Sequence, residues 1–571
     1  MAGTVRLRRD DFLLRNGYSS TAKVTQPIIN IDMPTLNWIG KEAVVNHHHQ
    51  VPFRLLKDVP DLACGEPGDG NLIVQGDNLV ALKALLPYYA GQVKCIYIDP
   101  PYNTGNEGWA YNDNVNSPVI REWLGKVVGK EGETLDRHDR WLCMMYPRLV
   151  LLRQFLREDG VIFVSLDDNE IQALRYVMDE IFGPANFVAT IIWQKVYAPK
   201  NSAKHFSEDH DFIIVYAKNA DKWRPQLVPR GDKQDKAYKN PDNDPRGLWR
   251  ADGMSARNAY SEGLYSVTTP SGRVIPGPPK GRYWVYSETK YREMDADNRI
   301  WWGKDGNNAP AVKRFLTEVK QGVVPQTLWP YDEVGHTQEG KKELVSIIDF
   351  ADSESVFITP KPVRLIERIL QVSTSPGDLV LDSFAGSGTM GHATLKLNQA
   401  APDKVPRRFI LVEMEQMIAR EITAERVRRV AEGYKNANGE QVNGLGGSFR
   451  YCELGEPLFD VSGKIRETVS FADLARHVYF TETGEPLPRE RVTKSPFIGE
   501  CRGVGIYLLF NGILGDKSAQ GGNVLTRSVL AKLPTFDGQK VIYCAGCLLG
   551  KDRLQAERIL VRQTPYEIKV S

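Results

Sequence analysis

The tetrapeptide Asp99-Pro100-Pro101-Tyr102 directly follows the apolar run KCIYI and could perform chemistry on an amine. The Asp99 carboxylate and the Pro100 carbonyl can both accept N–H bonds from one amine, which would orient its lone pair and stabilise developing charge. Consecutive prolines fix the backbone and cannot donate, so this carbonyl is held outward. The ring of Tyr102 offers a face on which an extruded base can stack. A plain proline-rich turn is the alternative interpretation.

A second candidate site is the glycine-rich turn in LVLDSFAGSGTMG, where an apolar run ends at Asp382 and Gly386 and Gly388 follow. Glycines allow close approach of a ligand, and the free amides at the start of a helix attract polar or anionic groups. Glu413 ends the next apolar run, where a carboxylate can accept hydrogen bonds from ribose hydroxyls. Because Gly391 completes G-x-G-x-x-G, a nicotinamide or flavin nucleotide also fits, as does a turn needed only for packing.

Alternating strand-like and helix-like runs must position these two motifs. Strands are predicted at 72–74, 94–99 and 160–166, with helices at 78–90, 140–157 and 169–182 between and after them. The pattern resumes with a helix at 361–372, a strand at 378–382, a helix at 383–397, a strand at 408–414 and a helix at 416–432. Such alternation predicts a parallel sheet. Ligands bind beyond the carboxyl ends of parallel strands, so we expect both motifs at one edge.

The stretch between the two α/β segments differs in character. Seven of the 11 tryptophans lie within 191–345, which is also rich in turn-forming residues and has 25 Lys and Arg against 20 Asp and Glu. This composition predicts a separate, loop-rich domain. After about residue 450, short apolar runs separated by polar turns predict a small α/β accessory domain.

Bulk properties limit the class of protein. The 571 residues predict two or three domains, and the net charge of +2 does not by itself indicate a nucleic-acid partner. No run approaches the roughly 18 apolar residues needed to span a bilayer, and no secretory signal is recognisable. We therefore expect a soluble cytoplasmic protein without a membrane partner. The seven scattered cysteines predict reduced, mostly buried thiols.

With DPPY preceding FAGSGT and a Trp-rich segment between them, the chain resembles the beta class of DNA amino-methyltransferases over roughly residues 35–455. Within this class it is most similar to the modification (Mod) subunits of type III restriction-modification systems. Further segments match family motifs: QGDNL (75–79), MMYPRL (144–149), EDGVIFVSLDDNE (158–170), IIWQK (191–195), FITPKP (357–362) and GGSFRY (446–451).

The resemblance implies an α/β fold, namely a Rossmann-like S-adenosylmethionine-dependent methyltransferase fold with permuted motif order. It implies an N-terminal arm at 1–50, a catalytic half at 51–199, a target-recognition domain at 200–345, a cofactor-binding half at 346–455 and an accessory domain at 456–571. The expected activity is methyl transfer from S-adenosylmethionine to adenine N6 of a flipped-out base in double-stranded DNA. Adenine is favoured over cytosine N4 because serine replaces Asp99 in typical cytosine enzymes.

The resemblance also implies roles for individual residues. Catalysis falls to Asp99, Pro100, Pro101 and Tyr102. The cofactor adenine would be contacted by Asp77, with Asn78 beside it. The remaining cofactor-binding residues would be Asp99, Phe357, Thr359, Lys361, Asp382, Phe384, Gly386, Gly388, Thr389 and Glu413.

Several alternatives stay open on the sequence. The chain could methylate cytosine N4 or RNA, or act mainly as a recognition subunit for a nuclease partner; a homodimer and a helicase-nuclease restriction subunit are both possible assemblies. His47-His48-His49 lacks further ligands at zinc spacing, and Asp167-Asp168 ends a predicted strand. We therefore predict no metal site.

Overall fold

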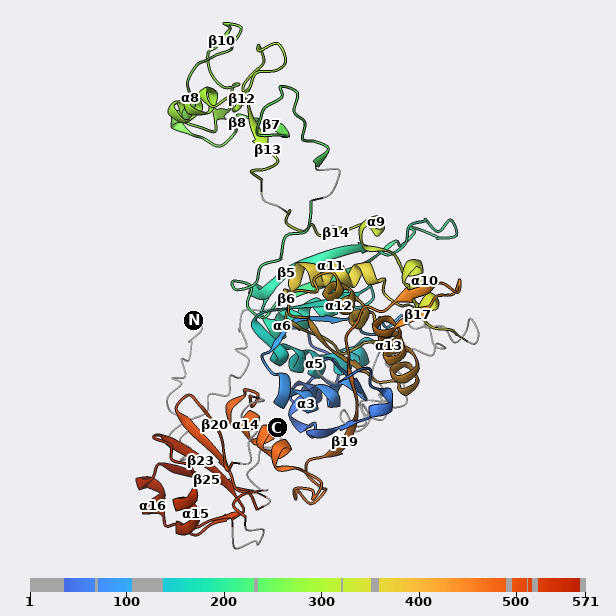
Figure 1. Cartoon of the computed structure of the whole chain (residues 1–571), viewed down its shortest axis with the longest axis vertical. Helices are drawn as coiled ribbons and strands as arrows, with labels where there is room; N and C mark the ends of the chain where they lie inside the picture. Colours follow the sequence, from blue (N-terminus) through green and yellow to red (C-terminus); the bar gives the residue numbers. More distant parts are fainter. Residues whose placement is uncertain are drawn as a thin grey trace, which may run out of the picture. The chain divides into compact units, whose positions relative to one another are not determined.

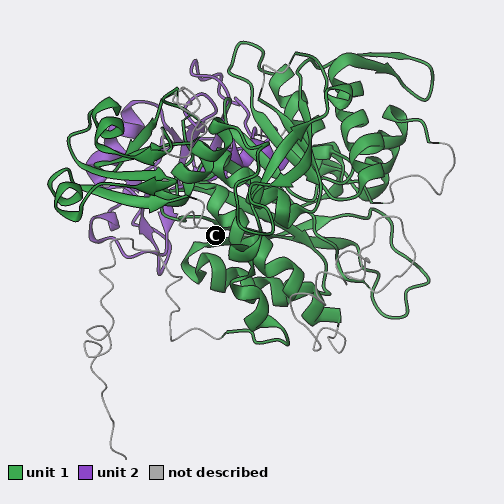
Figure 2. Cartoon of the chain, turned by 90° about the horizontal axis from the view of Figure 1, so that it is seen from below, with its two compact units in different colours: residues 1–223, 328–367, 376–571 green, residues 224–327, 368–375 purple. Residues whose placement is uncertain are grey.

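The computed structural model describes residues 35–66, 70–104, 137–230, 235–319, 322–350, 359–488, 495–510, 512–515 and 522–564. The chain forms two compact units (Figure 2). Unit 1 comprises residues 1–223, 328–367 and 376–571, and unit 2 comprises residues 224–327 and 368–375. Each unit is described by itself below.

Unit 1 is built on a ten-stranded sheet in the order β1-β19-β2-β16-β15-β3-β4-β6-β5-β14 (Figure 1). The strands are β1 (Arg54–Asp58), β2 (Leu72–Gln75), β3 (Val93–Ile98), β4 (Leu156–Leu166), β5 (Phe187–Gln194), β6 (His210–Ala217), β14 (Leu328–Trp329), β15 (Leu379–Asp382), β16 (Arg408–Glu413) and β19 (Arg450–Pro457). From β19 to β4 all neighbours are parallel, whereas β6 is antiparallel to β4 and to β5. The predicted Rossmann-like α/β fold is confirmed.

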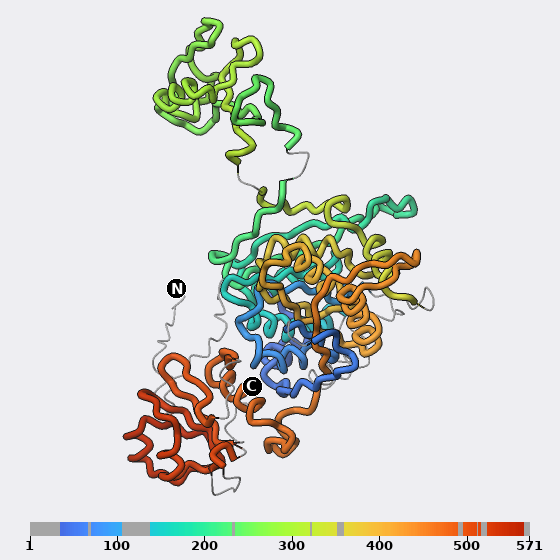
Figure 3. The backbone as a smooth tube through the Cα atoms, viewed as in Figure 1, coloured from blue at the N-terminus to red at the C-terminus, as the bar shows by residue number. Residues whose placement is uncertain are grey.

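The strand order brings distant parts of the chain together. β15 lies between β16 and β3, and β19 pairs with both β2 and β1, so the orange segment of Figure 3 lies beside blue ones. The chain leaves β3 toward β4 and leaves β15 toward β16. The space beyond the carboxyl ends of β3 and β15 is therefore the topological switch point, where α/β sheets bind ligands.

Helices cover one face of the sheet, to which every second side chain of its strands points. Ile96 and Ile98 of β3, with Leu379 and Leu381 of β15, belong to the main buried core. The same core contains apolar side chains of α3 (Asn78–Tyr89), α5 (Arg137–Phe155), α6 (Ile171–Phe182) and α14 (Phe471–Thr483). The three helices predicted between 78 and 182 are thus confirmed.

On the cofactor half, two predicted helices differ from the structure. The helix expected at 383–397 is α12 (Thr389–Gln399), because residues 383–388 form the turn before it. The helix expected at 416–432 is a π-helix over Ile418–Ala424 followed by α13 (Glu425–Glu432). Gly391 allows α12 to approach both α13 and β16, since a Cβ there would lie 2.8 Å from Val427 Cγ2 and 3.2 Å from Leu411 Cδ1. The other helices of the region are α9 (Tyr331–Val334), α10 (Thr337–Ile347) and α11 (Val363–Ser373).

Unit 2 contains fewer residues than the loop-rich segment 191–345 that the sequence indicates. The ends of that segment belong to the large sheet as β5, β6 and β14, because their apolar side chains complete its core. Unit 2 has the antiparallel sheet β12-β13-β7, two further strand pairs and α8 (Glu288–Ala296). Its strands are β7 (Trp249–Gly253), β8 (Ser255–Ala256), β9 (Val267–Thr268), β10 (Val274–Ile275), β11 (Tyr283–Trp284), β12 (Ile300–Trp301) and β13 (Ala311–Phe315). Trp284, Trp302 and Val312 belong to its own core.

The C-terminal part of unit 1 has a second sheet in the order β20-β21-β23-β25. Its elements are β20 (Phe497–Cys501), β21 (Val504–Leu508), α15 (Arg527–Lys532), β23 (Gln539–Cys544), α16 (Lys551–Ala556) and β25 (Ile559–Gln563). It joins the main core through α14, where the Phe53 and His477 rings lie 4.5 Å apart. Among the described residues, no helix has the length and apolar character that crossing a membrane requires.

Candidate active site

A cavity of about 340 Å³ lies at the switch point and collects most of the residues singled out by sequence. Its lining contains Asp99, Pro100, Tyr102, Thr359, Lys361, Asp382, Phe384, Gly386 and Thr389. Pro101, Asp77, Asn78, Gly388 and Glu413 do not line it. Phe357 lies outside the described residues. The two motifs, more than 270 residues apart in the chain, therefore meet in one cavity.

The turn that follows β3 presents two hydrogen-bond acceptors without partners. Asp99 Oδ2 forms an ion pair with Lys361 Nζ, whereas the buried Asp99 Oδ1 has no hydrogen bond in the described part of the chain. The Pro101 carbonyl accepts a bond of 2.7 Å from Trp141 Nε1. The Pro100 carbonyl receives none from any described residue. Asp99 Oδ1 and the Pro100 carbonyl, the two acceptors expected to bind an amine, therefore have no hydrogen bond from the described residues.

Tyr102 lies between two ion pairs. Lys361 Nζ is 5.2 Å from the centre of its ring, and its hydroxyl lies 3.5 Å from Asp211 Oδ2. Asp211 is only 3% exposed and its Oδ1 lies 2.5 Å from Lys195 Nζ. Burial raises the pKa of Asp211 while the Lys195 charge opposes that rise, and burial also raises the pKa of Tyr102 well above its usual value. The ring is therefore neutral and held in place.

Asp211, Lys195 and Trp193 were not predicted as site residues. Trp193 of β5 lies opposite Asp211 of β6 in an antiparallel pair, and Lys195 directly follows β5. In the sequence, Asp211 is visible only as an aspartate directly before the apolar run FIIVYA. An antiparallel return into a parallel sheet is not visible from alternation of strands and helices, so nothing pointed Asp211 toward the cavity.

The glycine turn is shaped by two left-handed residues, Gly386 at φ 49° and Gly388 at φ 74°. At Gly388 a Cβ would also lie 3.0 Å from the Thr423 carbonyl oxygen. Glu413 supports the turn from β16: its Oε2 accepts from Gly386 N at 2.8 Å and its Oε1 from Glu415 N at 3.0 Å. Glu413 is 2% exposed, so its predicted ribose contact stays a prediction.

Asp77 and Asn78 are occupied by contacts within the protein. Asp77 caps α3 by accepting from Val80 N at 3.1 Å, and its other oxygen pairs with Arg148 at 2.8 Å. Asn78 accepts from Arg148 Nε and donates to the Ser383 carbonyl at 3.0 Å. This network ties the start of α3 to the glycine turn. A cofactor contact of Asp77 or Asn78 likewise stays a prediction.

Two carboxyl groups are hard to ionise, Asp382 in the cavity lining and Glu413 bonded to the glycine turn. Burial raises the pKa of Asp382 well above its usual value, although Phe384 N donates to it at 3.0 Å. Burial raises the pKa of Glu413 from its ordinary value of 4.5 to about 7, despite the two backbone donors. This end of the sheet therefore carries less negative charge than its two carboxyl groups suggest.

Glu413 gives a pH-dependent prediction. A raised pKa in the folded state stabilises the protein at low pH, and this stability is lost as pH rises from about 4.5 to about 7. Glu413→Gln, which cannot ionise, should remove about 3 kcal/mol of the decrease in unfolding free energy between pH 5 and pH 8. Urea denaturation of each protein at both pH values measures this. The exposed Glu421→Gln is the control, and an unchanged pH dependence in Glu413→Gln would contradict the prediction.

The described residues contain no group of three His, Cys, Asp or Glu side chains that could hold a metal. In the triple histidine, His48 is buried and its pKa is lowered by burial to about 3. None of the seven cysteines forms a disulfide bond and five are buried, as predicted.

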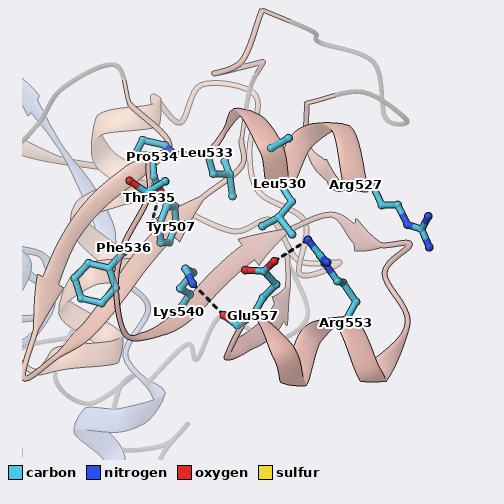
Figure 4. A pocket seen from close by; sticks show the side chains of 11 residues that line it. Tyr507, Arg527, Leu530, Leu533, Pro534, Thr535, Phe536, Lys540, Arg553 and Glu557 are labelled. Atoms are coloured by element: carbon cyan, nitrogen blue, oxygen red, sulfur yellow. Dashed lines mark hydrogen bonds and ion pairs between the residues drawn. The ribbon is translucent and has the colours of Figure 1, made fainter.

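A second cavity, of about 580 Å³, lies in the C-terminal part of unit 1 (Figure 4). Its lining includes Tyr507, Arg527, Lys540, Arg553 and Glu557. Arg553 and Glu557 form an ion pair of 2.7 Å, and Lys540 Nζ donates to the Glu557 carbonyl at 2.9 Å. None of the residues predicted from sequence lies in it.

The mixed sheet with its parallel centre, its strand order and the cavity at its switch point define a Rossmann-like methyltransferase fold. A family model described as DNA methylase matches residues 93–425, from the first residue of β3 to the first of α13 and more than half of the chain. The chain therefore belongs to the DNA methylase family.

Individual relatives cover about two thirds of the chain. The StyLTI Mod subunit, of a type III restriction-modification enzyme of Salmonella typhimurium, is 34% identical over 68% of this chain and 60% of its own length. The EcoPI Mod subunit of Escherichia phage P1 is 31% identical over 67% and 64%. The type II methyltransferase M.KpnI of Klebsiella pneumoniae is 29% identical over 67% and 89%. The chain thus spans less than two thirds of the length of these Mod subunits.

Among solved structures, the M1.HpyAVI–SAM complex aligns with 62% of this chain and 97% of its own. The sequence identity is 14% and the TM-score is 0.26.

Proposed function

We propose that the chain is a DNA methyltransferase that transfers a methyl group from S-adenosylmethionine to N6 of an extruded adenine. One observation carries the proposal: two open acceptors, Asp99 Oδ1 and the Pro100 carbonyl, share a cavity with the glycine turn. Membership of the DNA methylase family supports it. So do relatives named as Mod subunits and as type II methyltransferases.

The cavity suits such a cofactor. Asp99 Oδ1 is a buried polar atom of the cavity wall that lacks a partner among the described residues, and Gly386, whose φ is left-handed, lines the same cavity without a side chain. Thr359, Lys361, Phe384, Gly386 and Thr389 would hold it. When bound, it would supply an electrophilic methyl group on a positively charged sulfur.

The protein's own contribution is orientation of the amine. Asp99 Oδ1 and the Pro100 carbonyl accept the two N–H groups, so the lone pair faces away from them toward the methyl group. Their negative character stabilises the positive charge that develops on nitrogen. Tyr102 stacks on the base, a contact worth about 1–3 kcal/mol per base. No covalent intermediate with the protein is required.

Buried Glu170 anchors the backbone just after Tyr102. Asn103 has a left-handed φ of 59° and is fully buried. Its Nδ2 donates to Glu170 Oε1 at 2.5 Å and to the Arg137 carbonyl at 3.1 Å. His138 Nδ1 lies 2.6 Å from the same Glu170 oxygen. Glu170 is 1% exposed, so this anchor is well protected from water.

Loss of this anchor should slow catalysis without weakening cofactor binding. In Glu170→Ala we expect kcat to fall about 10- to 100-fold, because small displacements of reacting groups have effects of this size. Glu170→Gln keeps an oxygen that can accept from Asn103 and should recover most of the rate. Steady-state kinetics and calorimetric S-adenosylmethionine binding separate the two quantities. Equal losses in both variants, or weakened cofactor binding in Glu170→Ala, would contradict the anchoring role.

We further propose that residues 200–345, which include residues 224–327 of unit 2, read the DNA sequence. Two exposed arginines, Arg250 and Arg257, have no ion pair in the described part of the chain and would contact DNA; the Arg250 guanidinium lies 5.8 Å from the centre of the Tyr238 ring. Arg246 and Arg292 are instead paired with Asp244 and Glu288.

The remaining domain roles follow the boundaries expected from sequence, with residues 456–571 as an accessory domain. Since the relatives include Mod subunits, we propose that the chain serves a restriction-modification system in the cytoplasm, as a homodimer or with a helicase-nuclease partner.

Adenine rather than cytosine is proposed because Asp99 stands where cytosine enzymes typically carry serine. The test is incubation with methyl-labelled S-adenosylmethionine and mixed-sequence duplex DNA, followed by nucleoside chromatography. Label in N6-methyladenine is expected. Label in N4-methylcytosine would favour the second candidate activity, and unlabelled DNA would refute methyl transfer.

A further inference from the structure

Arg426 of α13 is a fully buried arginine directed at the glycine turn. Its exposed fraction is 0%. Nη1 lies 3.0 Å from Ser387 Oγ, 2.9 Å from Thr389 Oγ1 and 3.3 Å from the Ser387 carbonyl. Both residues line the cavity. A cation thus stands immediately behind two hydroxyl groups of the cavity wall.

The charge of Arg426 is not neutralised by an ion pair with any described residue. Nε has no hydrogen-bond partner, and Nη2 lies 3.4 Å from Nδ1 of His392, whose pKa burial lowers well below its usual value, so that ring is neutral. Glu343 acts on Arg426 electrostatically without an ion pair between them, and its Oε2 already accepts from Val363 N at 3.0 Å. Burial lowers the pKa of Arg426 only to about 10, so the side chain is charged at neutral pH.

Burying the Arg426 cation without an ion pair costs free energy. Its positive potential adds to that of the N-terminus of a helix. Thr389 is the first residue of α12, an 11-residue helix whose free N–H groups point toward the same end of the cavity. The two features together favour an anion beside Ser387 and Thr389. S-adenosylmethionine has one anionic group, the carboxylate of its methionine part.

We infer that Arg426 is a positioning residue that makes this end of the cavity bind the methionine carboxylate. The inference rests on the proposed function, because it presupposes that cofactor. Arg426 donates to both hydroxyl oxygens, so the Ser387 and Thr389 O–H groups are turned away from the guanidinium. The two hydroxyls lie 3.2 Å apart, and a carboxylate beside them would accept from both in place of this contact. Thr389 Oγ1 also lies 3.3 Å from the Lys361 carbonyl, a long contact that a carboxylate can replace.

The test compares two ligands that differ only in this group, S-adenosylmethionine and decarboxylated S-adenosylmethionine. Calorimetry gives the dissociation constant of each for the full chain. The unaltered protein should prefer the carboxylate-bearing ligand. In Arg426→Met this preference should shrink about 10- to 100-fold, the range expected for a hydrogen bond to a charged group. If Arg426 had only a structural role, Arg426→Met would weaken the binding of both ligands alike and leave the ratio of their dissociation constants unchanged.

Two further variants keep the test decisive. Arg429→Met removes the same charge from the same helix, but Arg429 pairs with Glu425 and Asp349 and should leave the ratio unaltered. If Arg426→Met does not fold, Ser387→Ala removes the hydroxyl between Arg426 and the cavity and should reduce the ratio by itself.

Three outcomes would overturn the inference. The first is an unchanged ratio in Arg426→Met, or in Ser387→Ala if Arg426→Met does not fold. The second is an equal affinity of the unaltered protein for both ligands, which leaves methyl transfer standing. The third is absence of binding to either ligand, which would refute the proposed cofactor as well.

Discussion

Asp99→Asn should reduce methyl transfer at least about 1000-fold while binding of DNA and of S-adenosylmethionine persists. Asp99 Oδ1 is the buried acceptor without a partner, and its position beyond β3 faces the cavity. An amide in its place can present an N–H to the amine and provides no negative charge to stabilise the transition state. The effect should therefore appear in kcat. Single-turnover label transfer, with calorimetry for each ligand, measures it.

The matched control for Asp99→Asn is Asp168→Asn. Asp168 follows β4 near the same sheet edge but is exposed and does not line the cavity. The Asp168→Asn variant should methylate DNA at the rate of the unaltered protein. The Lys361 partner of Asp99 is unpaired in the Asp99 variant, so thermal unfolding must accompany the assay. A variant that folds, binds both ligands and retains more than a tenth of the rate would show that the carboxylate is dispensable.

Lys313→Met should unfold the core of unit 2 locally and abolish sequence-specific DNA binding, leaving cofactor binding in unit 1 intact. Lys313 in β13 is 1% exposed and forms ion pairs with Asp242 and, at 3.0 Å, with Asp244. Removing Lys313 costs about 3 kcal/mol, because Asp242 loses its ion pair, whereas Asp244 keeps the pair with Arg246 at 2.8 Å. Asp242 then keeps only the 2.9 Å bond from Trp249 Nε1 among its described contacts.

Hydrogen exchange separates this local effect from global unfolding. Amides of β7 and β13 should exchange faster in Lys313→Met, whereas those of β3 and β15 should not. Lys290→Met is the control, because Lys290 forms an exposed pair with Glu293 on α8 of the same unit. Unchanged protection of β7 in Lys313→Met would mean that the charge cluster does not hold unit 2 together.

The sequence was sufficient to locate the cavity because both of its motifs end apolar strands. Asp99 and Asp382 could be placed at one edge once the strands were taken as parallel, and β15 indeed pairs with β3. The glycine turn could be recognised because left-handed φ values at Gly386 and Gly388 leave a strong local signal.

Other site residues could not be predicted because their roles depend on contacts between distant segments. Asp211 enters the cavity only through an antiparallel return to β4. Arg426 has the appearance of one more charge on a basic helix, and its burial against the glycine turn is a tertiary property. Glu413 and Asp77 carry carboxylates at the expected strand ends, yet each is bonded to the protein's own backbone or to Arg148.

The most direct test of the proposed activity is methylation mapping in a host that lacks other adenine methyltransferases. The chain and its Asp99→Asn variant are expressed separately, and genomic DNA is examined by long-read sequencing and nucleoside mass spectrometry. We expect N6-methyladenine at one recurring sequence with the unaltered chain and none with the variant. Methylation of cytosine N4 instead, or equal N6-methyladenine with both proteins, would contradict adenine methylation through Asp99.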